Sequence, residues 1–359
     1  MSARRSPPAA ADGLDWPLLV ALTDARGVSG DEDRVRALLA DAVAPHVDAL
    51  WTDPTGNLYA LRRGARAGSA DEPPVMVCAH MDEVGLIVTA ADGDGLLRLA
   101  AVGGVVPASV VGQRVRIGAG GVPGVVGLPP HAATTDADRA RLPGLAELRI
   151  DIGAATREAA LALVAVGDVA VWDTATLDLG HRLLGKAFDD RAGCWALAML
   201  LRARHAPDVV GVFSVQEETG LRGAGVAAHR LAPAVAFVLE CGTTDDTPRQ
   251  RDDAPVMRVG DGPAITLVDS GLVADRRLVE QLRAAAARAG IRHQLRAPKG
   301  GGTDGGRIHR MRAGIPTAVV SAPCRYLHGP QALVAKDDLA GMVALLGATL
   351  ADFTPPRPA

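Results

Sequence analysis

The sequence predicts an α/β protein in which helices flank a mostly parallel sheet and a small β-barrel domain is inserted into the chain. Two observations lead to this fold class. Apolar runs typical of buried strands alternate with segments of helical apolar spacing, which is the pattern of a parallel sheet covered on both faces. Between residues 85 and 180, short valine-rich runs recur between glycines instead, which favours a small barrel or sandwich. With 359 residues, the chain is long enough for both parts.

The first part of the chain is expected to form two helices and two strands. A turn at residues 27–30 separates the helices, and Ser29 or Asp31 is placed to cap the second helix. The second strand is a continuous apolar run, as expected of a strand buried on both faces, and it ends directly before His80. The predicted helices span 16–25 and 31–47, and the predicted strands span 58–61 and 74–79.

The inserted segment is expected to be mostly β-structure. Helical periodicity is nearly absent there, apart from one candidate helix at 155–164. Short valine-rich runs bounded by glycines are typical of strands joined by tight turns. The predicted strands of this segment span 86–90, 96–102, 105–111, 113–117 and 122–128.

The alternation of strands and helices resumes at Lys186 and continues to the end of the chain. A glycine-rich loop is expected at 299–306, and Asp337 or Asp338 is placed to cap the last helix. The predicted strands span 209–215, 235–239, 291–296 and 315–321, and the predicted helices span 192–204, 223–230, 273–289 and 337–350.

The overall composition excludes several classes of protein. A hydrophobic content of 48% with 22% charged residues is not that of a disordered or fibrous chain, and the net charge of −3 offers no basic surface for nucleic acid. No apolar run approaches the roughly 20 residues of a membrane span. Residues 1–13 lack the apolar core of a signal peptide, and they and residues 354–359 are expected to be flexible termini. The four cysteines form no CxxC pair and are interpreted as reduced thiols of a cytoplasmic protein: Cys78, Cys194, Cys241 and Cys324.

Five strand ends or tight loops carry residues of the types that bind metals. Each has an ordinary alternative: a lone histidine is more often a hydrogen-bonded surface residue, and an aspartate before a helix can simply cap it. Together, two histidines and three carboxylates suit two divalent cations bridged by a carboxylate and a water. The five are His80, Asp189, Glu218, Glu240 and His328.

Two further carboxylates accompany these residues. Glu217 directly precedes Glu218, and a solvated acidic turn is the ordinary interpretation of such a pair. With one glutamate on a metal, the other is free to act as a general base that moves protons. Asp82 follows His80 by two residues and is placed to accept the far imidazole N–H, which would fix the ring.

Several motifs resemble those of the TET family, the tetrahedral metallo-aminopeptidases, which include glutamyl and deblocking aminopeptidases. The resemblance extends from the turn at 27–30 to the C-terminal helix. Its motifs are AHMDEVG at 79–85, GKAFDDRAG at 185–193, QEETGLRGA at 216–224, LE at 239–240, GGTD at 301–304 and CRYLH at 324–328. In one departure, Gly329 stands where the family usually has serine.

The resemblance implies a role for each matched residue. His80 and Glu240 would hold one metal, Glu218 and His328 the other, and Asp189 would bridge both. Glu217 would be the general base and Asp82 would orient His80, whereas Thr303 and Asp304 would be structural neighbours of the site. The implied fold is a zinc-peptidase-like α/β domain at 14–84 and 181–353, with a β domain at 85–180 that helps to build a dimer and then a dodecamer.

The implied function is removal of N-terminal residues from short peptides by two divalent metal ions, zinc or cobalt, with manganese as a further option. The alternative is a metal-dependent amidase or deacylase of N-acyl amino acids or peptides. Some family members are described as cellulases, but carboxylates bound to metals are poor candidates for glycoside hydrolysis. A non-catalytic scaffold would have lost ligands, and none is lost. The preferred N-terminal residue does not follow from the sequence.

Overall fold

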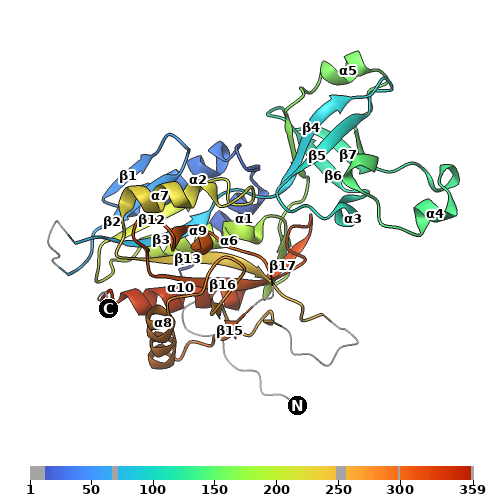
Figure 1. The fold of residues 1–359 in the computed structure, drawn as a ribbon. Helices are drawn as coiled ribbons and strands as arrows, with labels where there is room; N and C mark the ends of the chain where they lie inside the picture. The colour runs from blue at the N-terminus through green and yellow to red at the C-terminus, as the bar shows by residue number, and fades with distance from the viewer. Residues whose placement is uncertain (1–12, 67–71, 248–255, 298–299, 357–359) are drawn as a thin grey trace.

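The computed structural model describes residues 13–66, 72–247, 256–297 and 300–356; most of the two predicted termini lies outside these ranges. Within them, the chain forms an 11-stranded sheet flanked by helices and a closed six-stranded barrel that stands to one side of the sheet (Figure 1). The predicted fold class is therefore confirmed. The two parts have separate hydrophobic cores, because the apolar side chains inside the barrel form a cluster of their own.

The centre of the sheet consists of four parallel strands. β12 (Val209–Ser214), β3 (Val75–His80), β13 (Val235–Thr243) and β16 (Thr317–Arg325) lie side by side in this order. β3 is buried along its whole length, as its continuous apolar run predicts. Parallel strands end at the same edge of a sheet, so the residues that follow them are brought together there.

Antiparallel strands extend both sides of this parallel centre, so the sheet as a whole is mixed rather than mostly parallel. β2 pairs with β12 at one side, and β17 pairs with β16 at the other. The flanking strands are β1 (Ala49–Thr52), β2 (Leu58–Arg62), β17 (Ala332–Ala335), β11 (Arg182–Gly185), β10 (Leu177–Asp178), β14 (Ala264–Thr266) and β15 (Gln294–Arg296). Two of these seven strands, β2 and β15, were predicted at 58–61 and 291–296. The other five are only two to four residues long, so the sequence shows too little apolar alternation to identify them.

Helices cover the sheet in two groups. The long apolar helix α6 (Phe188–Leu201) packs on β3 and β13, and α1 (Trp16–Asp24), α2 (Asp33–Val43) and α10 (Lys336–Leu350) pack against it. α8 (Arg276–Ala289) lies beside α10. The second group consists of α7 (Arg222–Leu231) and α9 (Gly305–Ile308), which contact each other. A short 3₁₀-helix, η1 (Ala44–His46), directly follows α2. In the described part of the chain, no helix is long and apolar enough to cross a membrane.

The barrel closes in the order β4-β5-β8-β7-β6-β9. Its strands are β4 (Gly85–Ala91), β5 (Leu97–Val102), β6 (Arg114–Ile117), β7 (Val122–Gly127), β8 (Arg149–Asp151) and β9 (Val169–Trp172). The strand expected at 105–111 was wrong: this segment contains the short helix α3 (Pro107–Val110), which begins with a proline at its first position. The expected helix at 155–164 is present as α5 (Arg157–Leu161), and three further short helical segments are η2 (His131–Ala133), α4 (Asp136–Arg139) and η3 (Leu145–Glu147).

The helix caps expected from the sequence were wrong: Ser29, Asp31 and Asp338 have other partners, and Asp337 lies inside the first turn of α10, which begins at Lys336. α2 begins after Glu32, without a side-chain cap. The Ser29 hydroxyl donates to Asp82 Oδ2 at 2.6 Å instead, and Asp31 pairs with Arg26. At the last helix, Asp338 accepts the amides of two glycines in a neighbouring loop rather than capping α10.

Candidate metal centre

The structure brings the five predicted ligands to one place at the edge of the parallel strands. His80 is the last residue of β3, Glu240 lies within β13, and Glu218 follows β12. Asp189 lies at the start of α6, and His328 lies in the loop after β16. The five side chains come from five segments that are distant in sequence, and together they line one cleft of about 850 Å³.

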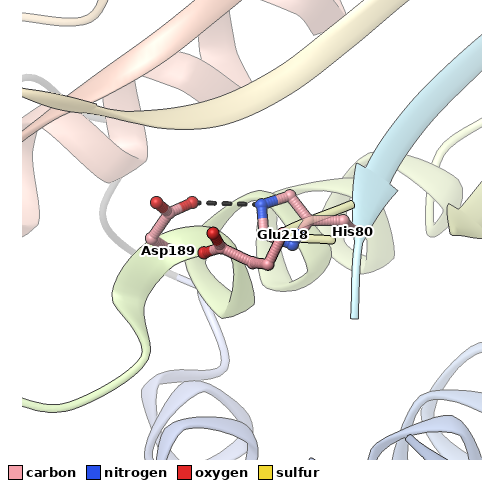
Figure 2. A group of neighbouring side chains, drawn as sticks. All are labelled: His80, Asp189 and Glu218. Carbon is pink, nitrogen blue, oxygen red and sulfur yellow. Dashed lines mark hydrogen bonds and ion pairs between the residues drawn. The ribbon is translucent and has the colours of Figure 1, made fainter. Parts of the chain in front are cut away.

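Asp189 lies between the two histidines. Its Oδ1 is 3.1 Å from Nε2 of His80, and its Oδ2 is 3.1 Å from Nε2 of His328. Figure 2 shows His80, Asp189 and Glu218 directed toward one another, with a dashed line for the first of these contacts. One carboxylate therefore contacts both rings, one through each oxygen.

Each histidine also has a second carboxylate close to the same nitrogen. Glu240 Oε1 is 3.4 Å from Nε2 of His80, and Glu218 Oε1 is 3.1 Å from Nε2 of His328. The site consequently has two halves of the same composition, each with one imidazole and one glutamate, and Asp189 is common to both.

The backbone at the start of α6 sets the position of Asp189. Asp189 and its neighbour Asp190 have non-helical backbone angles, and the peptide bond between them is cis. Asp190 is fully buried and accepts the backbone amides of His80 at 3.2 Å and Gly193 at 2.9 Å. The sequence analysis did not single out Asp190, although an oxygen of it also lies within 4.8 Å of ligand atoms of His80 and Glu240.

Asp82 is fully buried and joins the two motifs around it. Its Oδ1 is 3.4 Å from Nδ1 of His80, and the closer contact of that nitrogen, at 3.1 Å, is with the backbone carbonyl oxygen of Asp82. The Asp82 carboxylate accepts the backbone amide of Glu217 at 3.0 Å and that of Glu218 at 3.1 Å. The Asp82 carboxylate therefore has two contacts: it faces His80, and it fixes the loop that carries Glu217 and Glu218.

Glu217 lies beside the candidate metal centre but belongs to neither of its two imidazole–glutamate halves. Its Oε2 is 4.0 Å from Nε2 of His80, and the residue is 9% exposed. Thr303 is buried and lines the cleft, and Asp304 is fully buried and contributes to the raised pKa of Glu217. Asp304 Oδ2 accepts the Ser214 hydroxyl at 2.6 Å, which holds this carboxylate to the end of β12.

The electrostatics of the site reflect a buried excess of carboxylates. Burial raises the pKa of Glu217 well above its usual value, and burial together with the charge of Asp189 raises the pKa of Glu240 to about 8. Burial alone would lower the pKa of His328, but Asp189 and Glu218 outweigh it and raise that pKa to about 11. In the absence of another cation, the carboxyl groups retain protons because their negative charges would repel one another, and His328 retains its proton because carboxylates surround it.

The donors present fit divalent metal ions. Glu218 Oε1 is buried, and its 3.1 Å contact with Nε2 of His328 lacks hydrogen-bond geometry. A buried carboxylate oxygen without a well-aligned donor suits a cation. Imidazole nitrogens and carboxylate oxygens are the ligand types of zinc, cobalt and manganese sites. Two residues of the same cleft were not singled out by the sequence analysis: Gly104, whose carbonyl oxygen is 3.2 Å from Nδ1 of His328, and Arg296.

Comparison with known proteins agrees with this arrangement. A lysyl aminopeptidase of Pyrococcus furiosus is 32% identical over 353 residues, covering 95% of this chain and 98% of the relative. An aminopeptidase structure from Desulfurococcus kamchatkensis has a TM-score of 0.88 at 36% identity and covers 95% of this chain and 97% of its own. The TET1 peptidase of Pyrococcus horikoshii, which can assemble into a tetrahedron or a large octahedral shell, has a TM-score of 0.82 at 30% identity and covers 94% and 99%.

The match to the family is extensive, because the family model described as M42 glutamyl aminopeptidase matches residues 56–345. The resemblance inferred from the motifs is thereby confirmed, and so is the peptidase class. The chain belongs to the M42 glutamyl aminopeptidase family and is a metal-dependent aminopeptidase.

Proposed function

We propose that the two halves of the site hold two divalent cations and that the enzyme removes the N-terminal residue of short peptides. His80 and Glu240 would bind one cation, and His328 and Glu218 would bind the other. The single observation that supports this most strongly is the position of Asp189, whose two oxygens each lie 3.1 Å from a different histidine Nε2. A carboxylate placed in this way suits a bridge between two cations.

Glu217 would act as the general base of this reaction. When bound, the cations supply Lewis-acid activation of a water and of the scissile carbonyl. The Glu217 carboxylate takes the proton of the attacking water and later gives it to the leaving amine nitrogen. Two observations support this role: Glu217 lies near His80 without belonging to either half, and burial raises its pKa, which favours proton uptake.

Asp82 would position the metal-binding residues. Its backbone carbonyl and its carboxylate both face Nδ1 of His80, so the proton of that ring is expected on Nδ1 and Nε2 is left to bind a cation. The same carboxylate holds the amides of Glu217 and Glu218. The nitrogen and oxygen donors support zinc or cobalt as the cation, with manganese as the third candidate.

The experiment that tests this function is mass spectrometry of short peptides, free and N-acetylated, incubated with the enzyme. Each peptide is incubated after chelation and again after addition of Co²⁺ or Zn²⁺. Stepwise loss of residues from free N-termini only, dependent on metal, is the expected result. Release of the acyl group from blocked peptides would favour the deacylase instead. If metal is bound but neither the free nor the N-acetylated peptides are cleaved, both the aminopeptidase and the deacylase function are contradicted.

The barrel would mediate self-association of the enzyme, with a catalytic domain at 14–84 and 181–353 and a dimerisation domain at 85–180. Seven of the fifteen exposed large apolar side chains in the described ranges lie between residues 85 and 172, the span of the barrel strands, which supports an interface there. The assembly of the TET1 peptidase supports a homo-oligomer, either a dimer or a dodecamer. Light scattering of the purified enzyme distinguishes these states, and a monomer would contradict the proposal.

The enzyme would act in the cytoplasm. All four cysteines are free and buried, as suits a reducing compartment. Fractionation of the source cells with an antibody to the chain tests this location. Recovery in a compartment outside the cytoplasm would contradict it.

A further inference from the structure

Arg296, in β15, is a buried cation with few partners. The residue is 7% exposed, and the only hydrogen bond of its side chain within the described residues is from one terminal nitrogen to the Ser321 hydroxyl at 3.0 Å. Its Nε is buried without an acceptor, and no carboxylate of the described ranges lies within 4.0 Å of the guanidinium. A guanidinium carries five N–H donors, and a buried charge normally has a charged partner.

The position of Arg296 relates it to the candidate metal centre. Ser321, its hydrogen-bond partner, lies directly beside Glu240 in the register of β16 and β13. Paired residues of neighbouring strands project to the same face of a sheet. Arg296 also lines the cleft of about 850 Å³ that contains the two histidines. The unpaired donors are therefore located beside one half of the candidate metal centre.

Glycines shape the space around this guanidinium. A Cβ at Gly242 would lie 2.5 Å from a terminal nitrogen of Arg296, so the absence of a side chain there lets the guanidinium lie against the strand. Gly300 and Gly301 line the same cleft, and a Cβ on either would meet nothing within 4 Å. The cleft beside Arg296 consequently has room for a further chemical group.

The carboxylates around this part of the cleft have other partners. Asp269 accepts the amides of Gly271 and Leu272, each at 2.7 Å. Asp245 lines the cleft and accepts the amide of Val256 at 2.9 Å, while Glu240 faces His80. Asp269 and Glu240 interact with Arg296 electrostatically, without a hydrogen bond or ion pair to it. The remaining N–H donors of its guanidinium are therefore available for a ligand with two oxygens.

We propose that Arg296 binds a carboxylate group of the peptide substrate. This inference rests on the proposed aminopeptidase function, because it places the ligand in the same cleft. Two parts of a peptide can supply the group: the side chain of an acidic N-terminal residue, or the free C-terminal carboxylate of a dipeptide. Either presents two oxygens to the fork of N–H donors, as a bidentate pair requires.

The test compares pairs of ligands that differ only in this carboxylate. Glutamyl- and glutaminyl-p-nitroanilide test the side-chain source, and leucyl-leucine and its C-terminal amide test the other source. The variant Arg296→Met removes the charge, and Arg296→Lys retains it without the fork. Arg292→Met is the matched control, because Arg292 is exposed and pairs with Asp261 at the surface.

We expect the ratio of kcat/KM for carboxylate over amide to fall by about 10- to 100-fold in Arg296→Met for one of the two pairs. Arg296→Lys should give an intermediate ratio, and Arg292→Met should leave the ratio unchanged. The pair whose ratio changes identifies the source of the carboxylate. The inference is overturned if neither ratio changes in Arg296→Met, or if Arg292→Met changes them equally.

A binding measurement separates failure of this inference from failure of the proposed function. Calorimetric titration with L-glutamate, L-glutamine, leucyl-leucine and leucyl-leucinamide is done on metal-loaded enzyme that carries Glu217→Gln, so that the peptides are not consumed. If peptides are not hydrolysed but a carboxylate ligand still binds more tightly than its amide and only Arg296 variants lose this preference, the function fails and the carboxylate site stands. If peptides are hydrolysed and no preference exists in either measurement, the carboxylate site fails alone.

Discussion

Glu217 and Glu218 are neighbours in the chain, yet they reach different histidines. Glu218 approaches His328 at 3.1 Å, whereas Glu217 remains 4.0 Å from His80. Asp82 accepts the backbone amides of both, so the two side chains leave a fixed piece of backbone. At the residue scale, this fixed separation is what would allow one glutamate to bind a cation while the other moves a proton.

The variant Glu217→Gln tests this division of roles. Glutamine has the same shape but cannot accept the proton of a water, so kcat should fall by about 10²- to 10⁴-fold. Metal content should stay at the wild-type value, because Glu217 belongs to neither half of the site. Steady-state kinetics and elemental analysis on one preparation measure both. Glu280→Gln, on the exposed face of α8, is the control, and wild-type kcat in Glu217→Gln would refute the assignment.

Proton release should accompany metal binding. In the metal-free site the pKa of His328 is about 11 and that of Glu240 is about 8, so both groups hold protons at neutral pH. Ligands must lose these protons to bind a cation, so metal affinity should rise as the pH increases from about 6 to about 8. Calorimetry of metal uptake in buffers of different ionisation enthalpy measures the released protons. A pH-independent affinity would contradict the assigned ligands.

At the scale of elements, a buried ionic cluster connects the loop after β3 to the start of α6. Lys186 donates to both oxygens of Glu83, at 2.8 and 2.9 Å, and Arg191 lies 3.4 Å from the same carboxylate. Arg191 also donates to the carbonyl oxygen of Gly27, in the turn between α1 and α2. The cluster holds together three segments that carry or adjoin His80, Asp189 and Ser29.

Removing one member of this cluster should destabilise the fold. Lys186→Met leaves the buried Glu83 without its closest cation, and we expect a loss of about 3–5 kcal/mol in the free energy of unfolding. Arg63→Met, which breaks an exposed pair with Asp208, should cost less than about 1 kcal/mol. Urea unfolding of the chelated protein measures both. Equal losses in the two variants would show that the buried cluster contributes no more to the free energy of unfolding than the exposed pair does.

At the scale of the whole molecule, the inserted barrel reaches the candidate metal centre. The carbonyl oxygen of Gly104, in the loop after β5, is 3.2 Å from Nδ1 of His328. A carbonyl can only accept, so this contact favours a proton on Nδ1 and leaves Nε2 directed at Asp189 and Glu218. The barrel is thus attached to one half of the site in addition to having a core of its own.

The variant Gly104→Ala tests this connection. The added Cβ would lie 2.9 Å from Nδ1 of His328, so the ring must move. We expect the affinity for the cation in the His328 half to fall about tenfold or more, with the other half retained. Metal-to-protein ratios across a series of free-metal concentrations measure this. Gly127→Ala, in the barrel with open space around it, should behave as wild type, and equal occupancy in both variants would disprove the connection.

The sequence by itself determined the fold class, the peptidase family and the position of each candidate ligand. The fold class followed from apolar runs that are visible locally, such as the buried strands next to His80, Glu218 and Glu240. The family followed from the resemblance of short motifs, each contained in one continuous segment. The same locality explains two of the errors, since the predicted caps Ser29 and Asp338 have partners in distant segments.

Only the tertiary structure decided which residues surround the ligands. Asp190 faces the amide of His80, Gly104 contacts His328 from another domain, and Arg296 reaches Ser321 beside Glu240. Each of these contacts joins segments that are far apart along the chain. They depend on strand register and on the packing of one segment against another, and no local periodicity of the sequence encodes either.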